Sequence, residues 1–161
     1  MKKIILSLVL VFGCLTFANA QQNALGLKSS MINSNGWDIS YQRWLCESNR
    51  LEFNLGLSDL DTKYGTDFNL SAAYQWVFDL DQLATGFKWY VGAGAAAGLF
   101  THKDLDSQFR LAAIGNLGIE YNFKFPLQLA IDYTPTLSIT PSFGDFYGED
   151  RSVRFAARWR F

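Results

Sequence analysis

Apolar and polar side chains alternate with a period of two through almost the whole chain. The clearest stretch is LQLAIDYTPTLSIT at 127–140, where odd positions from Leu127 to Ile139 form an apolar face and even positions are small or polar. A period of two is that of a β-strand, whose successive side chains point to opposite faces of a sheet. No stretch after residue 20 keeps a convincing helical period. The pattern therefore predicts an all-β fold.

The same test predicts seven more strands, separated by turn-forming segments. The strands are expected at 23–32, 36–45, 50–58, 67–78, 86–100, 107–124 and 153–161. The segments between them are short and carry turn signals, such as NSNG at 33–36 and KFP at 124–126. Such connections join antiparallel neighbours. We expect an eight-stranded antiparallel up-and-down β-barrel with both termini at the same end.

The N-terminus has the three parts of a secretory signal peptide. MKK is basic, residues 4–12 are apolar, and Ala18-Asn19-Ala20 provides a cleavage site between small residues. The apolar run is too short to span a bilayer as a helix. We therefore expect residues 1–20 to be cleaved, and residues 21–161 to form a single barrel domain, because a chain of this length does not hold two cores.

Two cysteines bear on how the chain is processed. Cys14 follows the apolar run, and it leaves open a lipoprotein alternative in which this residue is lipidated instead of cleavage after Ala20. Against that alternative, Phe12 stands where such sites normally have a small residue. Beyond the predicted cleavage site only Cys46 remains, so an intramolecular disulfide is impossible in the exported chain.

Charge and motifs exclude several classes of function. The net charge of -1 gives no electrostatic reason to bind nucleic acid. The sequence has no Walker loop, no dinucleotide fingerprint and no Cys or His spacing typical of metal sites. GAGAAAG at 92–98 lies within a predicted strand and has no helix after it, so we interpret it as close packing. We expect no cofactor.

Two kinds of barrel fit this pattern, and they differ in which face is outside. A soluble lipocalin-like barrel turns its apolar face inward around a ligand, whereas an outer-membrane barrel turns it outward to lipid. The polar face here combines few charges with many small residues, which suit a narrow lumen better than a solvated surface. Aromatic residues are 16% of the chain and charged residues only 18%, against about a quarter charged in ordinary soluble domains. We favour a transmembrane barrel and keep the soluble ligand-binding barrel as an alternative.

The depth of the aromatic residues supports the membrane interpretation. If the chain enters from the periplasmic side, the aromatic residues of the apolar face fall near the two ends of the strands. This arrangement predicts two aromatic girdles at the membrane interfaces. Near the outer ends the pattern predicts a girdle of Trp37, Phe68 and Phe109. Near the periplasmic ends it predicts a second girdle of Trp76, Phe78, Phe87, Trp89, Tyr121, Phe123 and Trp159.

These features resemble the small bacterial outer-membrane β-barrel proteins of the OmpA transmembrane-domain and OmpX type, especially those common in Bacteroidetes. The resemblance rests on ANA before Gln21, on IEYNFKFPLQLAIDY at 119–133 and on the terminal RFAARWRF. It implies location in the bacterial outer membrane. It also implies that the assembly machinery reads the C-terminal strand as an insertion signal, here Phe161 with Trp159 and Phe155. The loops are shorter than in many adhesive relatives, which weakens the case for receptor binding.

Inward-facing charges are expected to fill the lumen, because an eight-stranded barrel is just wide enough for its own side chains. The predicted charge network comprises Lys28, Glu52, Lys88, Arg110, Glu120, Asp132, Arg154, Arg158 and Arg160, with Asp38 and Asp67 also facing inward. Folding the hairpins about their loops places Lys88 opposite Glu120, and Asp132 near Arg158 or Arg160. The network has two interpretations, a gated ion or proton path and a packed core of paired charges, of which we favour the second.

His102 supplies the enzymatic alternative. It is the only histidine and lies near Asp104, Asp106 and Ser107, so a lipid-modifying hydrolase of the outer membrane is conceivable. These residue types are also common in any polar turn. We therefore expect a non-enzymatic, monomeric protein with a structural or surface-interaction role. Its expected partners are outer-membrane lipid, lipopolysaccharide and the assembly machinery, and no nucleic acid.

Overall fold

Antiparallel strands make up nearly all of the described chain. The computed structural model describes residues 22–30, 36–58, 66–80, 82, 84–102, 105–139 and 153–161. The strands are β1 (Asn23–Ser30), β2 (Gly36–Cys46), β3 (Asn49–Ser58), β4 (Thr66–Asp79), β5 (Phe87–His102), β6 (Leu105–Asn122), β7 (Leu127–Tyr133), β8 (Thr136–Ser138) and β9 (Val153–Arg160). Within these residues no helix is long and apolar enough to cross a membrane. The predicted signal peptide and Cys14 lie outside the described residues, and both remain predictions.

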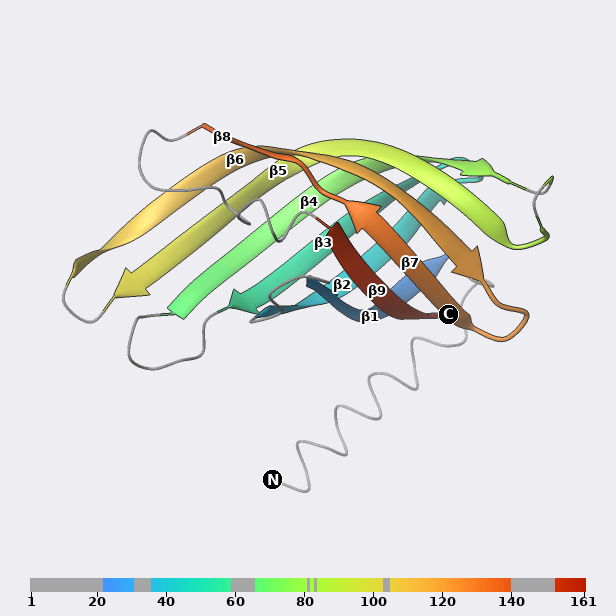
Figure 1. Ribbon diagram of the computed structural model, residues 1–161, viewed down its shortest axis with the longest axis horizontal. Helices are drawn as coiled ribbons and strands as arrows, with labels where there is room; N and C mark the ends of the chain where they lie inside the picture. Colours follow the sequence, from blue (N-terminus) through green and yellow to red (C-terminus); the bar gives the residue numbers. More distant parts are fainter. Residues whose placement is uncertain are drawn as a thin grey trace, which may run out of the picture.

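The strands close into a barrel through the pairing of the first strand with the last (Figure 1). Each of β2 to β6 pairs with its sequence neighbours, β7 pairs with β6 and β9, and β9 pairs with β1. At the seam, Ala24 lies opposite Arg160 and Ser30 lies opposite Arg154. Phe161 exchanges backbone hydrogen bonds of 2.9 and 3.0 Å with Asn23.

β7 and β8 are two parts of one barrel strand. Tyr133 pairs with Leu117, and Thr136 pairs with Ile114, so the register against β6 continues unchanged across the break. The break falls at Pro135, which has no N–H to donate to the ladder, although its carbonyl still accepts a 2.8 Å hydrogen bond from Gly115. The barrel therefore has eight strands around its circumference, and the predicted eight-stranded antiparallel up-and-down barrel is confirmed.

The strands are staggered by ten residues around the barrel. A row of paired residues that starts at Leu129 returns to the same barrel strand at Ile139. The row runs through Leu129, Ala157, Leu27, Ile39, Leu55, Leu70, Ala97, Leu111 and Ile139, and all of its members are apolar. Closed barrels need such a stagger, which accompanies a strand tilt of roughly 35–45°. The stagger brings side chains of non-adjacent strands to the same level of the lumen.

Both termini of the described chain lie at one end of the barrel, which we call the terminal end. The same end carries the short connections between β2 and β3 (47–48), β4 and β5 (80–86), and β6 and β7 (123–126). Gly86 in the second of these has a φ of 101°, a left-handed conformation that glycine adopts without strain. The other connections run at the opposite end and lie largely outside the described residues.

Burial is inverted relative to a soluble protein. Lys28, Glu52 and Arg158 are each 1% exposed, whereas Trp37 is 61% and Ile119 is 53% exposed. The described interior is thus polar and charged and the exterior apolar. A soluble ligand-binding barrel needs the opposite arrangement, so this alternative is disfavoured.

The outward aromatic residues lie at two levels along the barrel wall. Trp37, Phe68 and Phe109 belong to one row near the opposite end, linked through Leu57 and Leu99. The others lie toward the terminal end, where several rings touch. The ring centroids are 4.6 Å apart for Phe78 and Trp89, and 4.7 Å apart both for Phe87 and Tyr121 and for Tyr121 and Phe123. Trp76 and Trp159 are 44% and 54% exposed at this level.

Candidate functional site in the barrel interior

The strand parity decides which side chains enter the lumen. Apart from Ser29, the buried polar residues occupy even positions everywhere except on β4, where they occupy odd positions. Successive side chains of a strand point to opposite faces. Once one residue of a strand is known to face the lumen, every second residue along that strand faces it too. The predicted charged residues and a set of amide side chains share this inner face.

Glu52 on β3 is the centre of the lumen network. Its carboxylate lies 2.9 Å from the Lys28 ammonium and 3.1 Å from the Arg158 guanidinium. Three amides also donate to it, at distances of 2.7 to 3.1 Å: Gln42, Gln75 and Asn54. Two cations and three amide donors thus surround one buried carboxylate, which satisfies its hydrogen-bonding capacity without water.

Lys28 on β1 links Glu52 to a second carboxylate. Its ammonium lies 2.8 Å from Asp132 on β7. Asp132 also accepts hydrogen bonds from the Tyr90 hydroxyl at 2.9 Å and from Thr134 at 3.1 Å. A single ammonium therefore connects carboxylates from two walls of the barrel, and every one of these side chains is buried.

Arg50 on β3 forms a second cluster closer to the terminal end. Its guanidinium lies 2.6 Å from Glu120 on β6 and donates from Nε to Gln75 at 2.6 Å. The guanidinium carbon is 4.6 Å from the centre of the Tyr90 ring and 5.3 Å from that of Trp44. Stacking on two rings together with an ion pair is the environment that suits a buried guanidinium.

Two further arginines of β9 complete the described network. Arg154 pairs with Asp38 on β2. Besides its contact with Glu52, Arg158 donates to Ser40 at 2.9 Å and to Gln128 at 3.2 Å. β9 is therefore joined to the far side of β1 by side chains as well as by its backbone ladder.

The network differs from the sequence prediction in its partners. Lys88 does lie opposite Glu120 in the register, as the hairpin predicts. Its ammonium nevertheless pairs with Asp79 at 2.7 Å, while Glu120 pairs with Arg50. The predicted pairing of Asp132 with Arg158 or Arg160 is wrong, since Asp132 binds Lys28.

The remaining predicted residues lie nearer the two ends. Arg160 donates to the carbonyl of Phe123 at 2.7 Å in the β6–β7 turn. Arg110 is half-buried toward the opposite end and pairs in register with Gly98. The side chain of Asp67 lies outside the described residues.

Neutral side chains were the part of the network that sequence reasoning missed. Gln42, Gln75, Asn54, Asn116 and Tyr90 are all buried and contact the charged groups or one another. Their signal was present in the sequence, because each has the same strand parity as the charged residues. A prediction based on charged residues alone does not include these neutral side chains.

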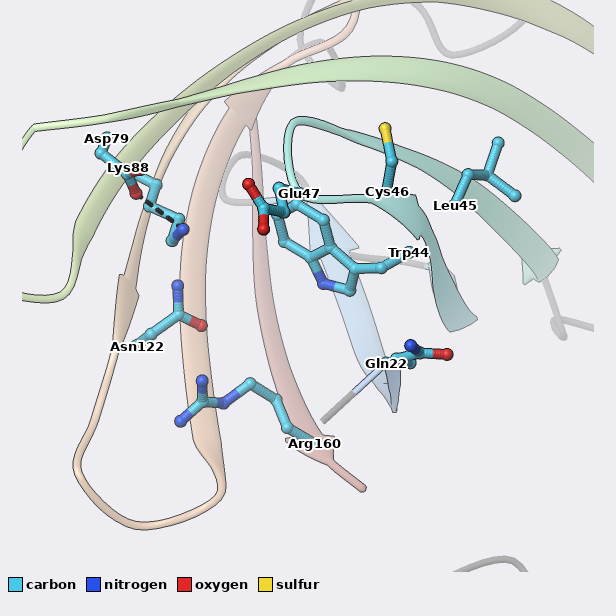
Figure 2. Close-up of a pocket in the computed structure, with 9 residues that line it drawn as sticks. All are labelled: Gln22, Trp44, Leu45, Cys46, Glu47, Asp79, Lys88, Asn122 and Arg160. Carbon is cyan, nitrogen blue, oxygen red and sulfur yellow. Dashed lines mark ion pairs between the residues drawn. The ribbon is translucent and has the colours of Figure 1, made fainter. Parts of the chain in front are cut away.

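An open pocket of about 560 Å³ lies at the terminal end of the lumen (Figure 2). It is lined by Gln22, Trp44, Leu45, Cys46, Glu47, Asp79, Lys88, Asn122 and Arg160. Figure 2 shows Trp44 among these side chains, with the Lys88–Asp79 ion pair nearby. The Lys88 ammonium is 5.5 Å from the centre of the Trp44 ring. On its inner side Trp44 meets the Arg50 cluster, with the guanidinium carbon 5.3 Å from the centre of the Trp44 ring.

Among the described residues, no three His, Cys, Asp or Glu side chains lie close enough together to hold a metal ion. His102 is the last residue of β5, and its side chain lies outside the described residues. The enzymatic alternative therefore remains a prediction.

The comparisons with known proteins agree on the fold. No family model matches the sequence, and neither does any curated protein. The N-terminal β-barrel domain of Pseudomonas aeruginosa OprF matches 89% of this chain over its whole length, with a TM-score of 0.68 and 16% identity. Neisserial surface protein A (NspA) matches 86% of this chain over 93% of its own length, with a TM-score of 0.52 and 15% identity. The chain shares the barrel fold of these two proteins. The resemblance drawn from the sequence is confirmed at the level of fold.

Proposed function

We propose that this protein is an integral β-barrel of the bacterial outer membrane, with a lumen closed to solutes. The observation that carries the proposal is the inverted burial of a closed barrel. Large apolar side chains such as Trp37, Ile119 and Ile39 are more than half exposed, while Lys28 and Glu52 are buried. Lipid solvates such an exterior, and a closed barrel satisfies its backbone polar groups internally.

The two aromatic levels support the same proposal. Trp, Tyr and Phe at the ends of a lipid-facing belt suit the membrane–water interfaces, where one part of the ring is in an apolar and another in a polar environment. The terminal end would then face the periplasm, since an exported chain starts and ends there. The opposite end would face outward.

The contacts in the lumen support a closed interior. Glu52, Lys28, Asp132, Arg50 and Glu120 join walls that are not adjacent in the sheet. Side chains of these lengths, paired across the lumen, occupy the space that a solute would need. The network therefore serves as a packed polar core that stabilises the barrel.

We propose a structural role in the envelope or an interaction at the surface through the outer connections. One of the similar barrels is described as a surface protein. The proposed partners are outer-membrane lipid and lipopolysaccharide. We further propose that the protein is monomeric, and that Phe155, Trp159 and Phe161 present the C-terminal strand to the assembly machinery.

Membrane fractionation and gel electrophoresis test the proposal. We expect the chain in the outer-membrane fraction and a shift in mobility between unheated and boiled samples, as is typical of a folded barrel in detergent. In planar bilayers the purified protein should form no stable large channels. Recovery as a soluble periplasmic monomer would contradict the membrane assignment, and sustained large conductance would contradict the closed lumen.

A further inference from the structure

The outer wall of the barrel carries an apolar groove of about 370 Å³ near the terminal end. Its outward lining residues come from four strands: Phe87 on β5, Ile119 and Tyr121 on β6, Leu129 and Ile131 on β7, and Phe155 on β9. Paired residues form its sides, since Ile131 lies between Ile119 and Phe155 in the register, and Tyr121 lies between Phe87 and Leu129.

The groove is flanked by aromatic rings that continue toward the β6–β7 turn. The ring centroids of Phe87 and Tyr121 are 4.7 Å apart, those of Tyr121 and Phe123 are also 4.7 Å apart, and those of Phe123 and Phe125 are 5.1 Å apart. A continuous row of aromatic rings therefore leads from the groove to the turn between β6 and β7.

A cation lies in that turn. Lys124 is exposed between Phe123 and Phe125. It lies two residues beyond Asn122, the last residue of β6, in the turn that joins β6 and β7. The groove thus has an apolar body and a positive charge on the side of the terminal end.

Arg160 holds this turn from the lumen side. Its guanidinium donates to the Phe123 carbonyl at 2.7 Å, and its backbone N–H donates to the Pro126 carbonyl at 2.9 Å. Phe123 and Leu127 close the turn with a further backbone hydrogen bond of 3.0 Å. A turn held in this way keeps Lys124 at the terminal end of β6 and β7, two of the strands that line the groove.

We propose that the groove and Lys124 together bind one glycerophospholipid of the periplasmic leaflet. One acyl chain would lie along Leu129 and Ile131, and the headgroup phosphate would pair with the Lys124 ammonium. An apolar body with a cation at interface depth matches the charge and polarity of such a lipid. This inference rests on the proposed membrane location, because only a membrane protein presents this wall to acyl chains.

Native mass spectrometry tests the proposal. The full chain would be folded into vesicles of phosphatidylethanolamine and phosphatidylglycerol, extracted in mild detergent, and examined for retained phospholipid. The wild type should retain one molecule. Leu129→Trp, which obstructs the groove, and Lys124→Glu, which reverses the charge, should each lower retention at least fivefold.

Two matched variants control for general effects on the outer surface. Leu70→Trp adds the same ring to β4, where Leu70 is 48% exposed. Arg43→Glu reverses an exposed outward charge on β2 at the terminal end. Both should retain lipid as the wild type does.

The proposal is overturned if the wild type retains no phospholipid, or if all variants retain it equally. Equal loss in the control variants would also overturn it, since this outcome indicates general lipid contact. A heat-dependent gel shift of each variant, recorded beforehand, establishes that the barrel has inserted. A barrel that shifts but binds no lipid contradicts this inference alone, whereas a chain that does not insert contradicts the proposed function.

Discussion

Arg50 Nη2 lies 2.6 Å from Glu120 Oε2, and this contact joins β3 to β6 across the lumen. Two strands, β4 and β5, separate the partners in the sheet. The backbone ladder holds only neighbouring strands together, so the ion pair links two walls that the ladder does not join directly. Its loss should therefore affect the barrel as a whole.

Replacing Arg50 with Met should destabilise the barrel by about 3–5 kcal/mol, because it leaves the Glu120 carboxylate buried without its partner. Urea unfolding in detergent micelles, followed by tryptophan fluorescence, measures the change. The double variant with Glu120→Gln should recover part of the loss, since both charges are then absent. An Arg50→Met barrel as stable as the wild type would show that the pair is dispensable.

Gly118 leaves room for a neighbouring ring in the lumen. A Cβ atom at this position would lie 2.5 Å from Cζ of Tyr90. Gly118→Leu should therefore cost about 1–3 kcal/mol through overpacking, measured by the same unfolding assay. Ala113→Leu is the control, because Ala113 lies on the outward face of the same strand. Equal stability of the two variants would contradict a tightly packed lumen.

Cys46 reports which end of the barrel faces the periplasm. The thiol is exposed at the end of β2. In intact cells a membrane-impermeant maleimide should leave it unlabelled, and permeabilising the outer membrane should expose it. The variant Cys46→Ser with Ser34→Cys, which moves the thiol to the β1–β2 connection, should show the reverse pattern. Labelling of Cys46 from outside would invert the proposed orientation.

Phe161 should matter more for assembly than for the stability of the finished barrel. Phe161→Ala removes the predicted insertion signal and should lower the amount of protein in the outer membrane several-fold, judged by quantitative blotting of fractions. Once refolded in detergent, the variant should unfold close to the wild type, because the backbone hydrogen bonds between Phe161 and Asn23 remain. Normal membrane levels would argue against the signal.

His102→Ala should have no effect on lipid A. The reason is that His102, Asp104, Asp106 and Ser107 are residue types common in any polar turn. Mass spectrometry of lipid A from cells expressing the wild type or the variant provides the measurement. A modified lipid A that depends on His102 would establish the enzymatic alternative instead.

The positions of the strands and the side of the wall to which each residue points were predictable from the sequence. Both depend on the period-two alternation of apolar and polar residues, which is a local property. The parity rule places Lys28, Glu52 and Asp132 inside and Ile131 outside, as the structure does. Even the register of the β5–β6 hairpin, with Lys88 opposite Glu120, follows from folding the chain about its connection.

The ion-pair partners were not predictable in the same way. Hairpin reasoning considers only adjacent strands, whereas Lys28 reaches Asp132 past β9 and Glu52 past β2. The ten-residue stagger of the whole barrel determines which inward residues meet. This stagger is the sum of the registers of all eight strand pairs, so no single hairpin determines it. The break at Pro135 was not predicted either, because the period-two alternation continues through 127–140; the missing N–H of proline explains it.

The pairing of β1 with β9 also constrains when the protein can form. Ala24 is among the first residues of the barrel to be synthesised and Arg160 among the last, yet they are neighbours in the sheet. A chain that lacks β9 leaves β1 and β7 each without one partner, and such unpaired edges invite aggregation. Closure of the barrel is therefore a late event that depends on a long-range contact. A truncated chain cannot close, and it keeps two strand edges with unpaired backbone groups.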